Sequence, residues 1–81
     1  MADTDIRDAL LAIADADQGR LLDPALYADA AGLERLIGFA GDRELALGTI
    51  MSVVRGAAKH GANTRVRSWA FFRAAIEADR R

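Results

Sequence analysis

Apolar residues recur at helical spacing along most of this chain, and each run of them begins at a residue type that commonly caps helices. The first run follows Asp3 and Thr4 and predicts a helix over residues 4–16. The second run begins at Asp23-Pro24, a capping residue followed by proline in the first helical turn, and continues to residue 40. Gly32 lies inside this run and weakens it by about 1 kcal/mol relative to alanine. The sequence therefore predicts either one helix with a weak point or two short pieces that break near Gly32, and we favour the second.

The middle of the chain predicts a further helix over residues 43–59. Gly41 ends the preceding run, and Asp42 is placed to cap the new one. Gly48 and Gly56 interrupt this helix, which suggests that another backbone approaches closely at those positions. The apolar spacing predicts that its buried face consists of Leu47, Ile50, Met51, Val54 and Ala58.

The last helix is expected over residues 69–80, after a short connection in which Val66 alternates with two arginines as in an extended segment. Ser68 is placed to cap this helix. Its inward face should carry Trp69, Phe72 and Ile76, whereas Phe71 is the aromatic residue that we expect to be exposed. No alternating strand pattern competes with these helices. The sequence thus predicts an all-α fold, a compact orthogonal or bundle-like arrangement of four or five short helices in one domain over residues 1–81.

Composition limits the class of protein. The 81 residues make one small domain, and although 52% of them are hydrophobic, many are alanine, so a thin core favours close helix packing or a homo-oligomer. The chain has no cysteine, no apolar run of membrane-spanning length and an acidic rather than a basic beginning. We therefore expect a cytoplasmic protein with no disulfide and no membrane partner. The sequence leaves open whether it is a full gene product or a domain excised from a longer protein.

Charge is divided unevenly along the chain. Residues 1–47 carry ten acidic residues and four arginines, a net charge of −6, whereas residues 48–81 carry seven basic and two acidic residues, a net charge of +5. A basic half of this kind often contacts nucleic acid. The alternative is that the acidic half neutralises the basic half, within one chain or between subunits, and the sequence leaves both interpretations open.

Residues for catalysis or metal binding are missing or wrongly spaced. The sole histidine, His60, follows the end of a predicted helix, and no Ser-His-acid or Cys-His set can be assembled around it. Asp15 and Asp17 suggest a calcium loop, but Gln18 occupies the position at which such a loop requires glycine. We therefore interpret the stretch as a solvated helix end that stops at Gly19. The glycine patterns of phosphate-binding loops are absent. We therefore expect no enzyme, no metal and no cofactor.

Basic residues gather between the third and the last predicted helix, and this is the candidate functional region. Ser68, together with the free backbone amides at the start of the last helix, would seat a phosphate group. Aromatic residues interleave with arginines there, as they do in proteins that bind single strands. The competing interpretation is ordinary surface charge beside a capping serine and a core of Trp69 and Phe72. The basic residues that could converge on one surface are Arg55, Lys59, Arg65, Arg67 and Arg73.

The stretch Val66-Arg67-Ser68-Trp69-Ala70-Phe71-Phe72, followed by Ala75-Ile76, resembles the C-terminal modules of bacterial and phage helix-turn-helix accessory proteins. It is similar, more distantly, to the C-terminal module of the DnaD-like primosomal proteins. The resemblance runs from Gly41 to Ile76, and Phe71 stands where those modules commonly carry tyrosine. It implies an accessory role in replication or transcription, through DNA contact or protein docking, and it carries over no catalytic residue.

Our leading hypothesis is a DNA-associated accessory module. Arg65, Arg67 and Arg73 would contact nucleic-acid phosphates, with Arg55 and Lys59 in support. The alternative is a protein interaction module that docks onto RNA polymerase, a replisome component or a second copy of itself. Its contact surfaces would be exposed apolar side chains beside Phe71 and the acidic first helix.

Overall fold

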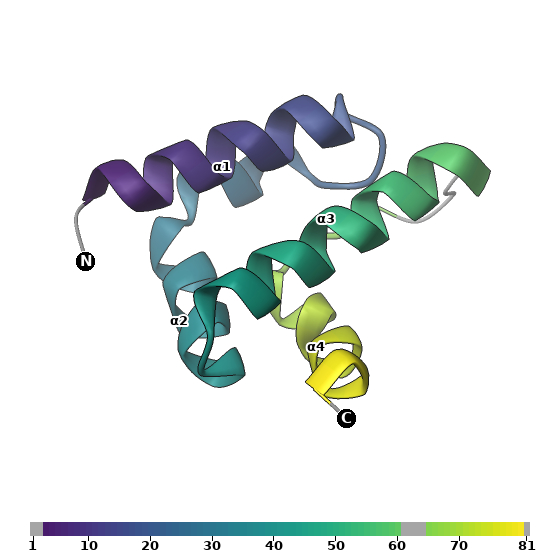
Figure 1. The fold of residues 1–81 in the computed structure, drawn as a ribbon. Helices are drawn as coiled ribbons and strands as arrows, with labels where there is room; N and C mark the ends of the chain where they lie inside the picture. Colours follow the sequence, from purple (N-terminus) through teal and green to yellow (C-terminus); the bar gives the residue numbers. More distant parts are fainter. Residues whose placement is uncertain (1–2, 61–64, 81) are drawn as a thin grey trace.

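The computed structural model describes the backbone of residues 3–60 and 65–80, and the side chains of residues 6–57 and 65–80. The all-α prediction is confirmed for this part of the chain, which forms four α-helices and two short 3₁₀ helices (Figure 1). These are α1 (Asp3–Asp17), η1 (Pro24–Ala28), α2 (Ala30–Ala40), α3 (Arg43–His60), η2 (Trp69–Phe72) and α4 (Arg73–Arg80).

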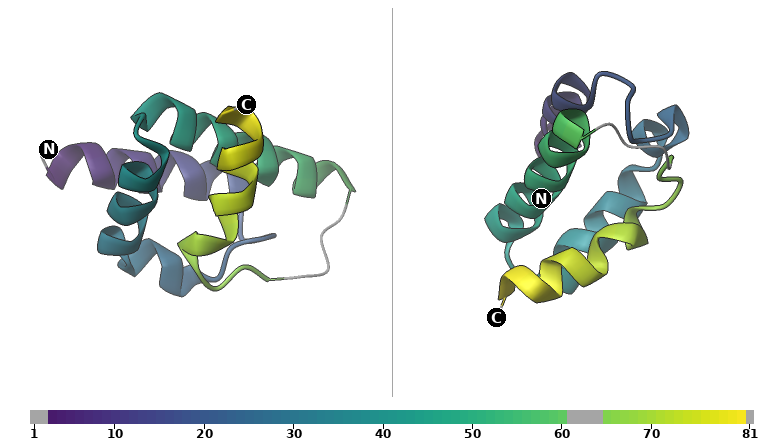
Figure 2. Two further views of the ribbon diagram at one scale, coloured as in Figure 1. Left: turned by 90° about the horizontal axis from the view of Figure 1, so that it is seen from below. Right: turned by 90° about the vertical axis from the view of Figure 1, so that its right-hand side faces the viewer.

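The helices form two layers with the core between them. In one layer α1 lies beside α3, and in the other α2 lies beside η2 and α4 (Figure 2). The shortest dimension of the Cα trace is 17 Å, which matches two layers of helices whose axes lie about 8–10 Å apart. The largest fully buried side chains come from both layers and include Trp69, Phe72, Ile13, Leu33 and Ile50.

Helix ends follow the capping signals of the sequence. Gly41 ends α2 in the left-handed conformation, with φ of 74°, which glycine adopts without strain. Asp42 then caps α3, because its carboxylate accepts the backbone N–H groups of Glu44 at 2.9 Å and Leu45 at 3.3 Å. Both predictions are confirmed.

The second apolar run is broken in two near Gly32, as predicted, and the break lies at Asp29. Asp23 caps η1 by accepting the N–H of Ala25 at 2.9 Å, and Asp29 ends η1 and caps α2 by accepting the N–H of Gly32 at 3.0 Å. The break is therefore caused by an aspartate that bonds to the backbone and starts a new helix. The low helix propensity of glycine is not its cause. Gly32 serves close packing, because a Cβ there would approach Trp69 Cδ1 to 2.8 Å and collide with the Asp29 carboxylate.

Two glycine-to-alanine changes in α2 should have opposite effects on stability. We expect Gly38→Ala to raise the free energy of unfolding by about 0.5–1 kcal/mol, because its Cβ meets nothing within 4 Å and alanine favours the helix. Gly32→Ala should lower the free energy of unfolding, because its Cβ must displace the Asp29 carboxylate and the Trp69 ring. Urea denaturation of both variants measures the difference, and equal stabilisation by both would contradict this packing.

The buried face of α3 differs from the predicted one. Leu47 and Met51 are only half-buried, whereas Ala46 and Thr49 are buried. The hydroxyl of Thr49 donates to Oδ2 of Asp79 in α4 at 2.6 Å. A polar residue therefore faces inward because a neighbouring helix supplies its partner, which apolar periodicity does not reveal.

Other predictions for α3 have mixed outcomes. Ile50 and Val54 are buried, as expected. The expectation that Gly48 and Gly56 mark a close backbone approach is wrong, because a Cβ at either position would meet nothing within 4 Å. The side chain of Ala58 lies outside the described residues.

The end of α1 is not solvated, in contrast to the prediction. The carboxylate of Asp17 is buried, with 1% of the residue exposed, and it accepts the backbone N–H groups of Leu21 at 2.8 Å and Leu22 at 3.1 Å. The hydroxyl of Tyr27 donates to the same carboxylate at 3.3 Å. Gly19, with φ of 73°, turns the chain so that the following residues return to Asp17. This carboxylate therefore holds the loop between α1 and η1.

The pairing with Asp17 also affects the ionisation of the single tyrosine. Burial, with the negative charge of Asp17 and its hydrogen bond, raises the pKa of Tyr27 to about 12. Because the pKa of tyrosine in an unfolded chain is about 10, the folded state holds this proton more tightly. The resulting stabilisation is complete below about pH 10 and is lost as pH rises from about 10 through about 12. Tyrosinate absorbance should therefore show a midpoint near 12, and a midpoint near 10 would contradict this environment.

The same loop receives the extended segment that precedes η2. Val66 forms a parallel bridge with Leu22: its N–H donates to the carbonyl of Leu21, and its own carbonyl accepts the N–H of Asp23, both at 2.8 Å. The side chain of Val66 is buried, and the arginines on either side of it are exposed, as the alternation predicted. The backbone of this segment is thereby fixed against the loop after α1.

Candidate functional site

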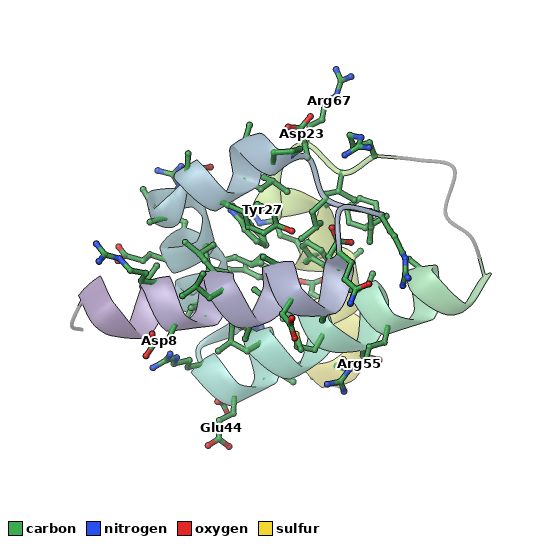
Figure 3. All side chains as sticks on the ribbon, turned by 90° about the horizontal axis from the view of Figure 1, so that it is seen from above. Asp8, Asp23, Tyr27, Glu44, Arg55 and Arg67 are labelled. Atoms are coloured by element: carbon green, nitrogen blue, oxygen red, sulfur yellow. The ribbon has the colours of Figure 1, made fainter. Side chains whose placement is uncertain are left out.

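The structure brings together some of the predicted basic residues and not others. Arg55 projects from α3 at one edge of the molecule, and Arg67 lies at the opposite edge (Figure 3). Arg65 and Arg67 lie in the extended segment before η2, Arg73 is the first residue of α4, and all three are exposed. The side chain of Lys59 lies outside the described residues. The candidate interface is therefore the segment 65–73 rather than a surface that includes Arg55.

Arg65 and Arg67 keep most of their hydrogen-bond donors available. One Nη of Arg65 donates to the carbonyl of Leu22 at 3.4 Å. Arg67 Nε lies 4.0 Å from Oδ2 of Asp23, and the Arg67 side chain is 83% exposed. An exposed pair at this distance contributes about 0–1 kcal/mol. Both guanidinium groups can therefore turn toward a ligand at little cost.

Ser68 begins η2 as predicted, but it occupies part of the proposed phosphate seat itself. Its hydroxyl oxygen accepts the N–H of Ala70 at 3.2 Å, and its carbonyl accepts the N–H of Phe71 at 3.1 Å. The start of η2 thus offers fewer free amide donors than the sequence suggested, and the arginines become the main candidate donors to an anion.

A pocket of about 230 Å³ lies between α2 and the segment that forms η2 and the start of α4. Its apolar lining includes Leu36 and Trp69, and Trp69 is itself fixed because its Nε1–H donates to the carbonyls of Leu26 and Asp29, both at 3.2 Å. The polar lining comes from both sides of the pocket and consists of Asp29, Arg35, Ser68 and Arg73.

Arg73 is held next to this pocket by an aromatic ring. Its guanidinium carbon lies 4.8 Å from the centroid of the Phe39 ring, and that of Arg80 lies 5.4 Å from the same centroid. Arg80 also donates to the carbonyl of Phe39 at 2.6 Å. Stacking of this kind fixes a guanidinium plane and leaves the N–H groups along its edge able to bind an anion.

Arg35 is a candidate that the sequence did not indicate. It belongs to the acidic half of the chain, for which the division of charge along the sequence predicts no basic surface. Arg35 and Phe39 are one turn apart on α2, and Arg35 lines the same pocket as Arg73. Among the described residues neither arginine has a carboxylate within ion-pair distance. Two unpaired arginines therefore lie beside one pocket.

Phe71 is exposed, as predicted for a partner-binding residue. It is 54% exposed and packs edge-on against Phe72, with ring centroids 5.4 Å apart and an interplanar angle of 89°. The other large exposed apolar side chain of the described residues is Leu11 on α1, which is 64% exposed. A partner protein could use either position.

Within the described ranges, no helix combines the length and the apolar character that crossing a bilayer requires. The same residues contain no group of three or more His, Cys, Asp or Glu side chains that could hold a metal ion. Comparisons with protein-family models, curated proteins and solved structures find no match for this chain.

Proposed function

We propose that this protein is a DNA-associated accessory module that contacts nucleic-acid phosphates, and that it acts as a binding module rather than an enzyme. Arg65, Arg67 and Arg73 are the chief donors, and Ser68 adds a hydroxyl. The observation that carries the proposal is the fixed backbone at Val66, which holds two exposed arginines at alternate positions of one segment. Donors on a segment whose backbone is already fixed bind phosphates with less loss of backbone freedom than donors on a flexible segment.

The exposed face of α4 favours phosphate contacts over the reading of base edges. Apart from the arginines at either end, which lie against Phe39, its exposed residues are Ala74, Glu77, Ala78 and Asp79. A recognition helix in the major groove needs side chains such as arginine, asparagine or glutamine on that face. Contacts through the segment 65–73 would instead position the protein without selecting a sequence. The resemblance of this segment to helix-turn-helix accessory modules supports a replication or transcription setting.

The double variant Arg65→Ala/Arg67→Ala tests the proposal. We expect weaker binding to labelled single strands and duplexes, and a plot of log affinity against log salt whose slope falls by about two units, because two phosphate contacts are lost. Fluorescence anisotropy between about 50 and 200 mM salt measures both quantities. Helicity by circular dichroism should not change, because both side chains are exposed.

Arg55→Ala is the matched control, because this arginine is also exposed but projects from the edge of the molecule opposite Arg67 (Figure 3). We expect it to leave the salt slope nearly unchanged. An unchanged affinity and slope in the double variant would contradict the assignment of the interface.

The second candidate function, docking to a protein partner, is favoured by the exposure of Phe71. Apolar docking persists or strengthens as salt rises, whereas phosphate binding weakens. A partner that is retained at high salt by the wild type and lost with Phe71→Ser would support docking, and equal retention by both proteins would contradict it.

A further inference from the structure

The pocket between α2 and η2 carries charged groups that the folding of the core does not require. Arg35 and Arg73 come from helices far apart in the sequence, yet both line this one opening. Two like charges that line one opening repel each other, and no carboxylate of the described residues lies within ion-pair distance of either. The guanidinium of Arg73 is nevertheless held in place by the Phe39 ring. An anion between the two arginines would turn this repulsion into attraction.

We propose that this pocket is a nucleotide-binding site in which Arg35 and Arg73 donate hydrogen bonds to the phosphate group. The inference rests on the proposed function in part, since Arg73 and Ser68 belong to both sites. Planar guanidinium groups match the spacing of phosphate oxygens and bind them through paired N–H donors. The hydroxyl of Ser68 lies in the same lining and can donate a further hydrogen bond.

Two features indicate a sugar phosphate rather than a simple anion. Oδ1 of Asp29 accepts the N–H of Gly32, and Oδ2 has no hydrogen-bond partner among the described residues, so it can accept a hydroxyl from a ligand. The pocket volume of about 230 Å³ lies below the range of about 300–1,000 Å³ typical of drug-sized ligands. The phosphate and the ribose would therefore occupy the pocket, against Leu36 and Trp69, and the base would lie outside it.

The single tryptophan provides a direct measurement. Trp69 lines the pocket, and its Nε1–H donates to the carbonyl of Asp29, so the one indole N–H resonance reports on this site. We expect adenosine 5′-monophosphate and ribose 5-phosphate to shift this resonance in the ¹⁵N-labelled full chain, and adenosine to leave it unchanged. Arg35→Ala and Arg73→Ala should each weaken the binding of adenosine 5′-monophosphate by about tenfold. Arg55→Ala, whose side chain lies outside the pocket, should not.

Two strands of the same sequence, one with and one without a 5′-phosphate, identify the source of the nucleotide. Tighter binding of the phosphorylated strand, lost in Arg35→Ala, would support the site and assign it to a strand end. Equal binding of both strands, with binding of the mononucleotide retained, would support a site for free nucleotides.

Failure of the pocket and failure of the proposed function give different results. If the strands bind with the expected salt dependence but no nucleotide shifts the indole resonance and Arg35→Ala has no effect, the pocket assignment is overturned and the proposed function stands. If neither strands nor nucleotides bind, both are overturned.

Discussion

Asp17→Ala should lower the free energy of unfolding by about 2–5 kcal/mol, because it leaves two buried backbone N–H groups without an acceptor. Those groups belong to Leu21 and Leu22, which are themselves buried. The hydroxyl of Tyr27 also loses its acceptor. A small domain has about 5–15 kcal/mol of stability in total, so this one carboxylate would account for a large share of it.

The loss should reach the candidate interface as well. Asp17 holds the loop against which Val66 is bonded, and that bond fixes the segment carrying Arg65 and Arg67. Under conditions in which Asp17→Ala remains folded, we therefore expect faster amide hydrogen exchange at Val66 than in the wild type.

Two matched variants separate the hydrogen bonds of Asp17 from a general effect of charge. Asp15→Ala removes a carboxylate that is exposed on the same helix, and it should change stability by no more than about 0.5 kcal/mol. The stability of Asp17→Asn should lie between those of Asp17→Ala and Asp15→Ala, because the amide oxygen can accept one N–H whereas the NH₂ group faces the other N–H. Urea denaturation followed by circular dichroism measures all three, and an Asp17→Ala protein as stable as Asp15→Ala would refute this role.

Trp69→Ala should lower the free energy of unfolding by about 3–5 kcal/mol. The indole is 2% exposed and its ring centroid lies 6.0 Å from that of Phe72, so its removal leaves a cavity in the middle of the layer formed by α2, η2 and α4. The carbonyls of Leu26 and Asp29, at the junction of η1 and α2, lose their common donor as well. Both the packing and the η1–α2 junction should therefore weaken.

Trp69→Phe and Phe71→Ala are the comparisons for this prediction. Trp69→Phe keeps an aromatic ring and loses the N–H donor, so we expect a loss of about 1–3 kcal/mol. Phe71 lies in the same 3₁₀ turn but is exposed, and Phe71→Ala should cost only about 0.5–1.5 kcal/mol through its edge-on contact with Phe72. Far-UV circular dichroism in urea is the appropriate probe, because it does not depend on tryptophan. Similar losses for Trp69→Ala and Phe71→Ala would contradict the inward placement of Trp69.

Features that depend on neighbours a few residues away could be predicted from the sequence. Asp23, Asp42 and Ser68 each accept a backbone N–H two residues further on, so the start of each helix is set by local chemistry. The break before α2 also has a local signal, because Asp29 is a capping residue three positions before Gly32. Burial of Trp69 and Phe72, with exposure of Phe71, followed from helical spacing.

Features that depend on distant neighbours could not be predicted. Asp17 is of a residue type that is common at solvated helix ends. The backbone N–H groups that it binds come from the loop that returns to it. Thr49 faces inward because Asp79, thirty positions away in the chain, accepts its hydroxyl proton. A polar residue is stable in the core when such a partner exists, and residue type alone does not reveal the partner.

The sequence by itself determined that this protein is helical, where most of its helices begin and that Arg65 and Arg67 lie outside, because hydrogen bonds and apolar spacing within one or two turns decide those features. Only the tertiary structure decided which arginines share a surface. Arg35 and Arg73 line one pocket, whereas Arg55 lies apart from it. The packing of α2 against η2 and α4 brings together side chains from the acidic and the basic halves of the chain. The distribution of charge along the sequence does not reveal that packing, because the pocket forms only where α2 packs against η2 and the start of α4.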